Sequence, residues 1–226
     1  MLKPRKKFTK KELKQDKFVL FTLEAEKFIK EKSGMLLRTG LILVAVVLLV
    51  GFYVRSKSSA NREAQTMLGE INISLSLNKK DQAIKQLKTL VDRYEGTFSA
   101  SQGSFLLAKL YYDDGKIKDA ATYFKKYIDE YSDDDILTPS ALAGYADCLY
   151  KQKKYDQAAL YYEKAYKSNK DFPEAAAFLY SAALSYRDAG DKAKAAEAAK
   201  KVVQEFKDSP YKSRAELLIE ELKIKV

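Results

Sequence analysis

The chain has 226 residues and a formal net charge of +10, with one cysteine and no histidine. Histidine-based catalysis, histidine metal sites, internal disulfides and multi-cysteine zinc sites are therefore excluded. The first 57 residues hold 14 of the 41 Lys and Arg and 5 of the 31 Asp and Glu. The rest of the chain therefore has 27 basic and 26 acidic residues, whose charges nearly cancel. Because a nucleic-acid-binding domain would carry excess positive charge, no nucleic-acid partner is expected.

Residues 1–34 are a basic segment with a predicted helix. Thr9 followed by Glu12 fits a helix-capping box, and apolar residues continue up to Ser33 and Gly34, where we expect the helix to end. Two interpretations stay open. The helix either lies on anionic headgroups and sets topology, or it docks a cytoplasmic or membrane partner.

Residues 35–55 are predicted to be a transmembrane anchor. The apolar run 36–54 would span roughly 28 Å as a helix, close to the thickness of a bilayer's hydrocarbon core. Residues 1–34 carry 11 Lys and Arg, and the positive-inside rule then places the N-terminus in the cytoplasm and residues 56–226 outside. A signal peptide cleaved near Ala60 and a buried core helix are the alternatives; the length of the run favours an uncleaved anchor.

Residues 56–226 contain a repeated helix–turn–helix pattern. Equivalent alanines at positions 83, 120, 158 and 195 are spaced 37, 38 and 37 residues apart. Such a period predicts an all-α solenoid of about four helical hairpins, which typically binds other proteins. The predicted units are residues 60–95, 99–131, 138–169 and 173–207, followed by a capping helix over residues 209–224.

A small residue, an aromatic residue, a turn glycine and a second small residue recur in these units. In the second unit they are Ala108, Tyr111, Gly115 and Ala120. This pattern resembles the tetratricopeptide repeat family, from which the third unit departs with Lys153 at the turn. A bulky side chain at a small position would push the paired helices apart. The expected packing positions are Ala83, Ala108, Ala120, Ala146, Ala158, Ala183 and Ala195.

The layout of the whole chain narrows the resemblance. A basic leader, one span and repeats that fill the rest of the chain resemble the ancillary SecYEG translocon subunit family. The resemblance implies a single-pass inner-membrane protein with periplasmic repeats, whose partners are translocon subunits and periplasmic chaperones. The alternative is a structural or assembly subunit of another envelope complex, for division, outer-membrane assembly or secretion.

The family's register places the first helix of each unit on the concave wall. The wall would combine aromatic, small and charged residues, which suits extended or helical peptides with apolar anchors. The candidate peptide-binding positions are Gln102, Phe105, Lys109, Tyr112, Ser140, Ala143, Asp147, Tyr150, Tyr180, Leu184 and Arg187.

No motif for chemistry accompanies the repeats. The sequence has no phosphate-binding glycine loop, no metal-ligand cluster and no nucleophile with a paired base, so we expect no enzyme activity, cofactor, metal or small-molecule substrate. The acidic run 133–135 lacks the spacing of a calcium loop and is expected to cap a helix. Cys148 is expected to be a buried packing residue, with a redox or intermolecular role as the alternative.

Overall fold

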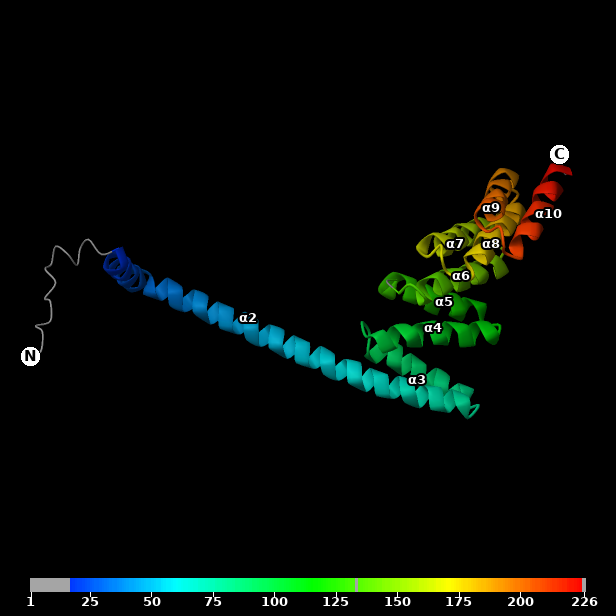
Figure 1. Ribbon diagram of the computed structural model, residues 1–226. Coiled ribbons are helices and arrows are strands. Elements are labelled where there is room, and N and C mark those ends of the chain that lie inside the picture. The colour runs from blue at the N-terminus through cyan, green and yellow to red at the C-terminus, as the bar shows by residue number, and fades with distance from the viewer. Residues whose placement is uncertain (1–16, 133, 225–226) are drawn as a thin grey trace, which may run out of the picture. The chain divides into compact units, whose positions relative to one another are not determined.

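The computed structural model describes residues 17–132 and 134–224, in which all regular structure is α-helical, as predicted (Figure 1). Two compact units follow one another along the chain, residues 1–58 and 59–226. The helices are α2 (Lys17–Ser76), α3 (Lys80–Arg93), α4 (Phe98–Asp113), α5 (Ile117–Tyr131), α6 (Leu137–Lys151), α7 (Tyr155–Ser168), α8 (Ala175–Ala189), α9 (Lys192–Glu205) and α10 (Tyr211–Ile224).

Helix α2 runs without a break from Lys17 to Ser76. The prediction that a helix ends at Ser33 and Gly34 is therefore wrong, because one helix contains residues 17–34 together with the apolar run. A single glycine weakens a helix by only about 1 kcal/mol relative to alanine, and the neighbouring Glu, Lys and Leu residues favour the helix. Gly34 also lacks the positive φ that commonly ends helices. The predicted cap at residues 9–12 lies outside the described residues.

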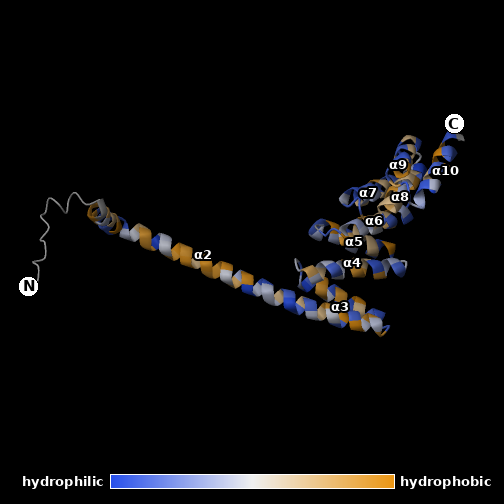
Figure 2. Cartoon of the chain, in the orientation of Figure 1, coloured by the Kyte–Doolittle hydropathy of each residue, from blue (hydrophilic) through white to orange (hydrophobic). Residues whose placement is uncertain are grey.

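The apolar run of α2 exposes its side chains. Leu43 and Val47 retain 65% and 68% of their accessible surface, and none of the most apolar 18-residue window is buried. Figure 2 shows this stretch as a nearly continuous hydrophobic band along the helix. By length and composition alone, α2 is able to cross a membrane.

Residues 59–226 form a stack of helical hairpins (Figure 1). The end of α2 pairs with α3, and then α4 pairs with α5, α6 with α7, and α8 with α9. Helix α10 covers the last hairpin and buries Ala215, Leu218 and Leu222 against it. Consecutive helices therefore supply most of one another's packing partners, as in other solenoids.

The turns inside the four hairpins share one backbone geometry. In each, one residue adopts a left-handed conformation after the first helix. At the third turn, Lys153 N–H donates to the Tyr150 carbonyl at 2.9 Å, and Lys154 N–H donates to the Leu149 carbonyl at 3.0 Å. These two bonds form a Schellman motif, which satisfies carbonyls at the helix end. The left-handed residues are Asn78 (φ 57°), Gly115 (φ 72°), Lys153 (φ 61°) and Gly190 (φ 87°). The departure from glycine at Lys153 thus leaves the turn unchanged.

We expect Lys153→Gly to stabilise the repeat domain by about 1 kcal/mol, because the left-handed conformation costs side-chain-bearing residues about 1–2 kcal/mol and part of that gain is lost to backbone entropy. Urea unfolding followed by circular dichroism measures the change. The same substitution at Lys200, an exposed position in the middle of α9, should instead destabilise by about 1 kcal/mol. A loss of stability in the Lys153 variant would contradict the strain at this turn.

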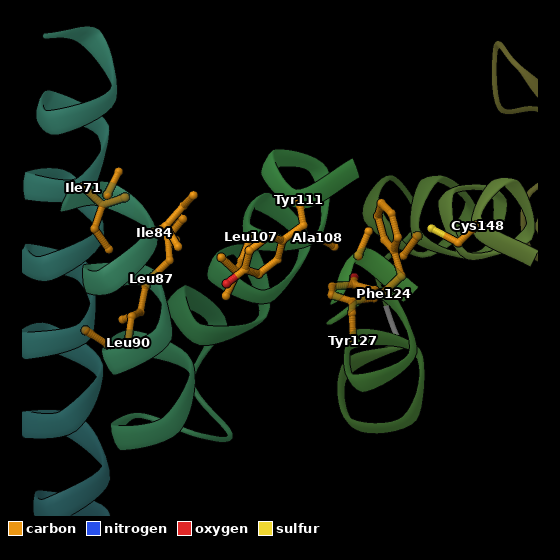
Figure 3. Close-up of a cluster of buried hydrophobic side chains, with 14 residues drawn as sticks. Ile71, Ile84, Leu87, Leu90, Leu107, Ala108, Tyr111, Phe124, Tyr127 and Cys148 are labelled. Atoms are coloured by element: carbon orange, nitrogen blue, oxygen red, sulfur yellow. The ribbon is translucent and has the colours of Figure 1, made fainter. Parts of the chain in front are cut away.

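Fully buried alanines separate the paired helices. The alanines of the repeated pattern at positions 83, 108, 120, 146, 158, 183 and 195 all have no exposed surface. Larger apolar residues fill the spaces within and between hairpins, and Figure 3 shows Ile71, Leu87, Leu107 and Phe124 in one such cluster. The short side chains allow close helix approach, and the long ones supply most of the buried area.

Cys148 is a packing residue of α6, as predicted. It has no exposed surface and belongs to the cluster in Figure 3. Burial raises the pKa of its thiol to about 12, with the neighbouring Asp147 carboxyl as a second cause. The thiol therefore stays protonated at neutral pH, where a reactive cysteine would be a thiolate.

Asp134, in the acidic run before α6, caps that helix. The Asp134 side-chain Oδ1 accepts hydrogen bonds from the backbone N–H groups of Ile136 at 2.8 Å and Leu137 at 2.7 Å. A carboxylate at this position satisfies N–H groups that have no partner inside the helix. The predicted capping role is confirmed for Asp134, and Asp133 lies outside the described residues.

Candidate functional site

A pocket of about 330 Å³ is formed by α4, α5, α6, α8 and the segment that leads into α8. It brings together six of the predicted wall positions, namely Phe105, Lys109, Tyr112, Ser140, Ala143 and Asp147. The other lining residues are Asp113, Phe124, Gly144, Phe172, Glu174 and Phe178. Its volume is at the lower end of the range of about 300–1,000 Å³ for ligand sites, so it is suited to a side chain or a short segment.

Aromatic rings make up most of the apolar lining. Phe105 of α4 meets Phe124 of α5 edge to face, with 5.9 Å between ring centroids and an interplanar angle of 68°. Phe172, in the turn before α8, stacks on Phe178 of α8 at 5.8 Å and 16°. Rings that already hold one another in preferred geometries offer a guest side chain a rigid apolar surface.

Gly144 allows α6 to lie close to Phe124. A Cβ atom on Gly144 would be 2.5 Å from Phe124 Cζ and under 3 Å from both Cε atoms of the ring. No side chain larger than hydrogen fits there unless the ring moves, and the ring is buried with 3% exposed surface. Glycine at this position therefore sets how far the aromatic lining lies from α6.

Asp147 is the most buried ionisable group in the pocket lining. Burial raises the pKa of its carboxyl, while a hydrogen bond donated by the Tyr162 hydroxyl and the nearby Lys151 ammonium lower it in part. Burial also raises the pKa of Tyr162, with Asp147 as the next cause, and raises the pKa of Tyr112 to about 12. Both phenols therefore stay neutral near pH 7, and the pocket's charge comes from its carboxyls and Lys109.

We expect Asp147→Asn to gain stability relative to the parent protein as the pH rises from 4 to 7. Below the ordinary pKa of 3.8 the carboxyl is protonated in both the folded and unfolded states. Between 3.8 and the raised folded value, only the folded state keeps the proton, so the parent's free energy of unfolding falls as the pH rises. Asparagine cannot ionise and escapes this loss, and its amide oxygen can still accept the bond from Tyr162.

Urea unfolding of both proteins between pH 3.5 and pH 7.5 tests this expectation. Asp156→Asn removes an exposed carboxyl from α7 and is the matched control. A constant difference between the Asp147 variant and its parent across the pH range would contradict a burial-raised pKa.

The other predicted wall positions lie outside the pocket. The Tyr150 hydroxyl donates to Asp188 of α8, and Arg187 pairs with Asp188 at 2.9 Å and with Glu221 of α10 at 3.7 Å. The ring of Tyr180 packs against that of Tyr211, with 5.6 Å between the ring centroids. Leu184 packs against the C-terminal core and Gln102 is half-buried. Peptide binding at any of these positions stays a prediction.

The sequence prediction misses three of the five aromatic residues that line the pocket. Phe172 belongs to the segment between two repeats, where the family pattern assigns no wall position, and Phe178 lies beyond the predicted wall register of α8. Phe124 of α5 belongs to the hydrophobic core and also lines the pocket. Two phenylalanines only six residues apart at a proline-containing helix start were the one available signal.

Comparison with protein families identifies the repeats. The family described as tetratricopeptide repeat-like domain matches residues 27–169, and a second tetratricopeptide repeat family matches residues 146–210. Comparison with curated proteins returns no significant match.

Solved structures share the fold at low sequence identity. A tetratricopeptide repeat protein from Parabacteroides merdae superposes with a TM-score of 0.60 at 13% identity, over 73% of this chain and 61% of that one. The pilF protein of Pseudomonas aeruginosa superposes with a TM-score of 0.53 at 18% identity, over 74% and 70%. At these identities the similarity establishes the architecture and nothing finer.

Proposed function

This chain belongs to the tetratricopeptide repeat-like family, and from that premise we propose that it is a membrane-anchored module that binds protein segments in its concave wall. Repeats of this kind serve as scaffolds for protein–protein interaction. Within residues 17–132 and 134–224 no group of His, Cys, Asp and Glu is placed to hold a metal ion.

The pocket is the observation that carries this proposal. Stacked repeats bury apolar side chains in their core, but here Phe105, Phe172 and Phe178 stay half-exposed around a concave space. A preformed apolar concavity with a few polar groups at its edge is the usual form of a recognition site. Such a concavity is better suited to the anchor side chain of a peptide than to a flat protein surface.

The apolar run of α2 supports the membrane part of the proposal. Residues 36–54 are long enough to span a bilayer, and the basic residues before them favour a cytoplasmic N-terminus and an extracytoplasmic repeat domain. An anchor of this kind would raise the effective concentration of the wall near membrane-bound partners. Weak individual contacts would then suffice for function.

We further propose that the partners are found at the Sec translocon, where the wall would meet emerging chains or periplasmic chaperones. The layout of leader, span and repeats supports this proposal. The second candidate is a structural subunit of another envelope complex. It is favoured by the exposed apolar residues Phe21, Leu23 and Phe28 before the run, which exceed what topology alone requires.

Photo-crosslinking in the source organism tests the binding wall. The full-length chain carries the photoreactive residue p-benzoylphenylalanine in place of Tyr112 in the pocket, or in place of Leu160 on the exposed face of α7 as the matched control. We expect Tyr112 alone to crosslink to partners. Equal crosslinking from both positions, or none from Tyr112, would contradict a binding wall at this site.

Two measurements separate the finer proposals. Alkaline extraction should leave the full-length chain in the membrane pellet and release a variant that lacks residues 36–54. Mass spectrometry of the Tyr112 crosslinks should then identify translocon subunits or periplasmic chaperones. A different envelope complex in stoichiometric amounts would instead support the structural-subunit candidate.

A further inference from the structure

The charged residues of the pocket lining are mostly acidic. Asp113 at the end of α4, Asp147 of α6 and Glu174 before α8 contribute three carboxyls, against the single ammonium of Lys109. Asp113 and Glu174 are exposed, and among residues 17–132 and 134–224 no ion pair involves either of them. They are therefore available to an incoming cation.

Two nearby ammonium groups offset only part of this charge: Lys151 lies close to Asp147, and among the described residues Lys109 forms no ion pair with these carboxyls. The Lys109 ammonium lies 6.0 Å from the centroid of the Phe105 ring, a cation–π geometry. By contrast, Asp114, the neighbour of Asp113 outside the pocket, is paired with Lys80 and Lys116. The acidic excess is thus local to the pocket, in a domain whose charges otherwise nearly cancel.

Two kinds of contact are combined at one place. Phe105, Phe124, Phe172 and Phe178 offer an aromatic surface to one large apolar side chain. The exposed carboxyls come from two different elements, the end of α4 and the start of α8, so residues on either side of such an anchor would meet negative charge. Charge complementarity of this kind selects between partners with similar apolar anchors.

We infer that the pocket recognises an extended peptide segment in which a large apolar residue is flanked by lysine or arginine. This inference rests on the proposed function and specifies its ligand. Acidic segments are disfavoured at the same site by repulsion from Asp113 and Glu174. Lys109 and Lys151 do not outnumber the three carboxyls, so they leave this preference in place.

Fluorescence anisotropy with defined peptides tests the inference on the full-length protein in mild detergent. The probes are labelled Gly-Ser-Lys-Phe-Lys-Ser-Gly, the same peptide with Glu in place of both Lys, and the same peptide with Ser in place of Phe. We expect the Lys-Phe-Lys peptide to bind about tenfold more tightly than either of the others. The two exposed ion pairs together, or the apolar anchor alone, should each change the affinity by up to about tenfold. The affinity of the Lys-Phe-Lys peptide should also fall as salt is raised.

Charge reversal at the edge of the pocket is the decisive variant. The double variant Asp113→Lys with Glu174→Lys should lose the preference for the Lys-Phe-Lys peptide and gain affinity for the Glu-Phe-Glu peptide. Asp92→Lys with Asp156→Lys makes the same change of charge at exposed positions outside the pocket and should behave as the parent protein. Ala143→Phe, which fills the pocket, should abolish binding of every peptide.

The possible outcomes are distinct. If the Glu-Phe-Glu and Lys-Phe-Lys peptides bind equally and Ala143→Phe abolishes both, the inference is overturned while the proposed peptide wall stands. If both charge-reversed double variants lose the preference for the Lys-Phe-Lys peptide equally, the inference is also overturned, because the preference would then come from net charge. If no peptide binds and Tyr112 gives no crosslinks, the proposed function fails together with the inference.

Discussion

Replacing Ala158 with arginine is expected to destabilise the repeat domain by about 4 kcal/mol, the sum of overpacking and of burying a charge without a partner. Ala158 of α7 has no exposed surface and lies in a cluster with Leu142, Leu149 and Tyr162. A long charged side chain cannot fit between α6 and α7 unless the hairpin opens. Urea unfolding followed by circular dichroism at 222 nm measures the loss.

The control for this variant is two residues away on the same helix. Leu160 is 52% exposed, and Leu160→Arg should change the free energy of unfolding by no more than about 0.5 kcal/mol. Unfolding of the two variants at the same urea concentration would mean that Ala158 does not separate α6 from α7. The assignment of the third repeat would then be wrong.

Gly144→Leu is expected to cost about 3 kcal/mol, at the upper end of what overpacking a core usually costs. The new side chain would begin 2.5 Å from the Phe124 ring, which is held edge to face by Phe105. Either the ring leaves its place or α6 moves away from α5. Thermal unfolding measures the loss of stability, and binding of the Lys-Phe-Lys peptide reports the distortion of the pocket.

A second substitution separates steric clash from other effects of a leucine. The double variant Gly144→Leu with Phe124→Ala should lose less stability than the sum of the two single variants, by about 1–2 kcal/mol, because the leucine fits in the space that the ring leaves. Gly69→Leu is the matched control, since a Cβ at Gly69 of α2 meets nothing within 4 Å. Additive losses at Gly144 and Phe124 would contradict a direct contact.

The fold of the repeats was accessible from sequence because it depends on short, periodic constraints. A small residue is needed wherever two helices pack closely, and alanine therefore recurs at fixed spacing. A larger residue at such a position would destabilise the fold, so the recurrence can be recognised in the sequence. The backbone of the turn was less accessible. Lys153 breaks the glycine pattern, yet the flanking helices impose the left-handed conformation on it because the Schellman bonds offset its cost.

The pocket was only partly accessible, for a physical reason. Phe105 and Asp147 recur in register with the wall, so the family pattern places them. Phe172 reaches the pocket through an irregular turn, whose path depends on tertiary contacts such as the bond from the Asn169 amide to the Asp135 carbonyl at 3.0 Å. Likewise, the helix end expected at Ser33 was predicted from the low helix propensity of Ser33 and Gly34. Helix on both sides of them overrides this local preference, because extending an existing helix is easier than starting a new one.

The equivalent turns at positions 78, 115, 153 and 190 also mark where the chain can be cut and rejoined. Each interval between them contains one complete second helix and the complete first helix of the next hairpin, so its two ends have the same backbone geometry. Removing residues 116–153 would join Gly115 directly to Lys154, the residue that precedes α7, and α7 would follow α4 as α5 does now. The solenoid is therefore able to shorten or lengthen in whole steps, and gain or loss of a step would change which binding pockets it carries while leaving the turns intact.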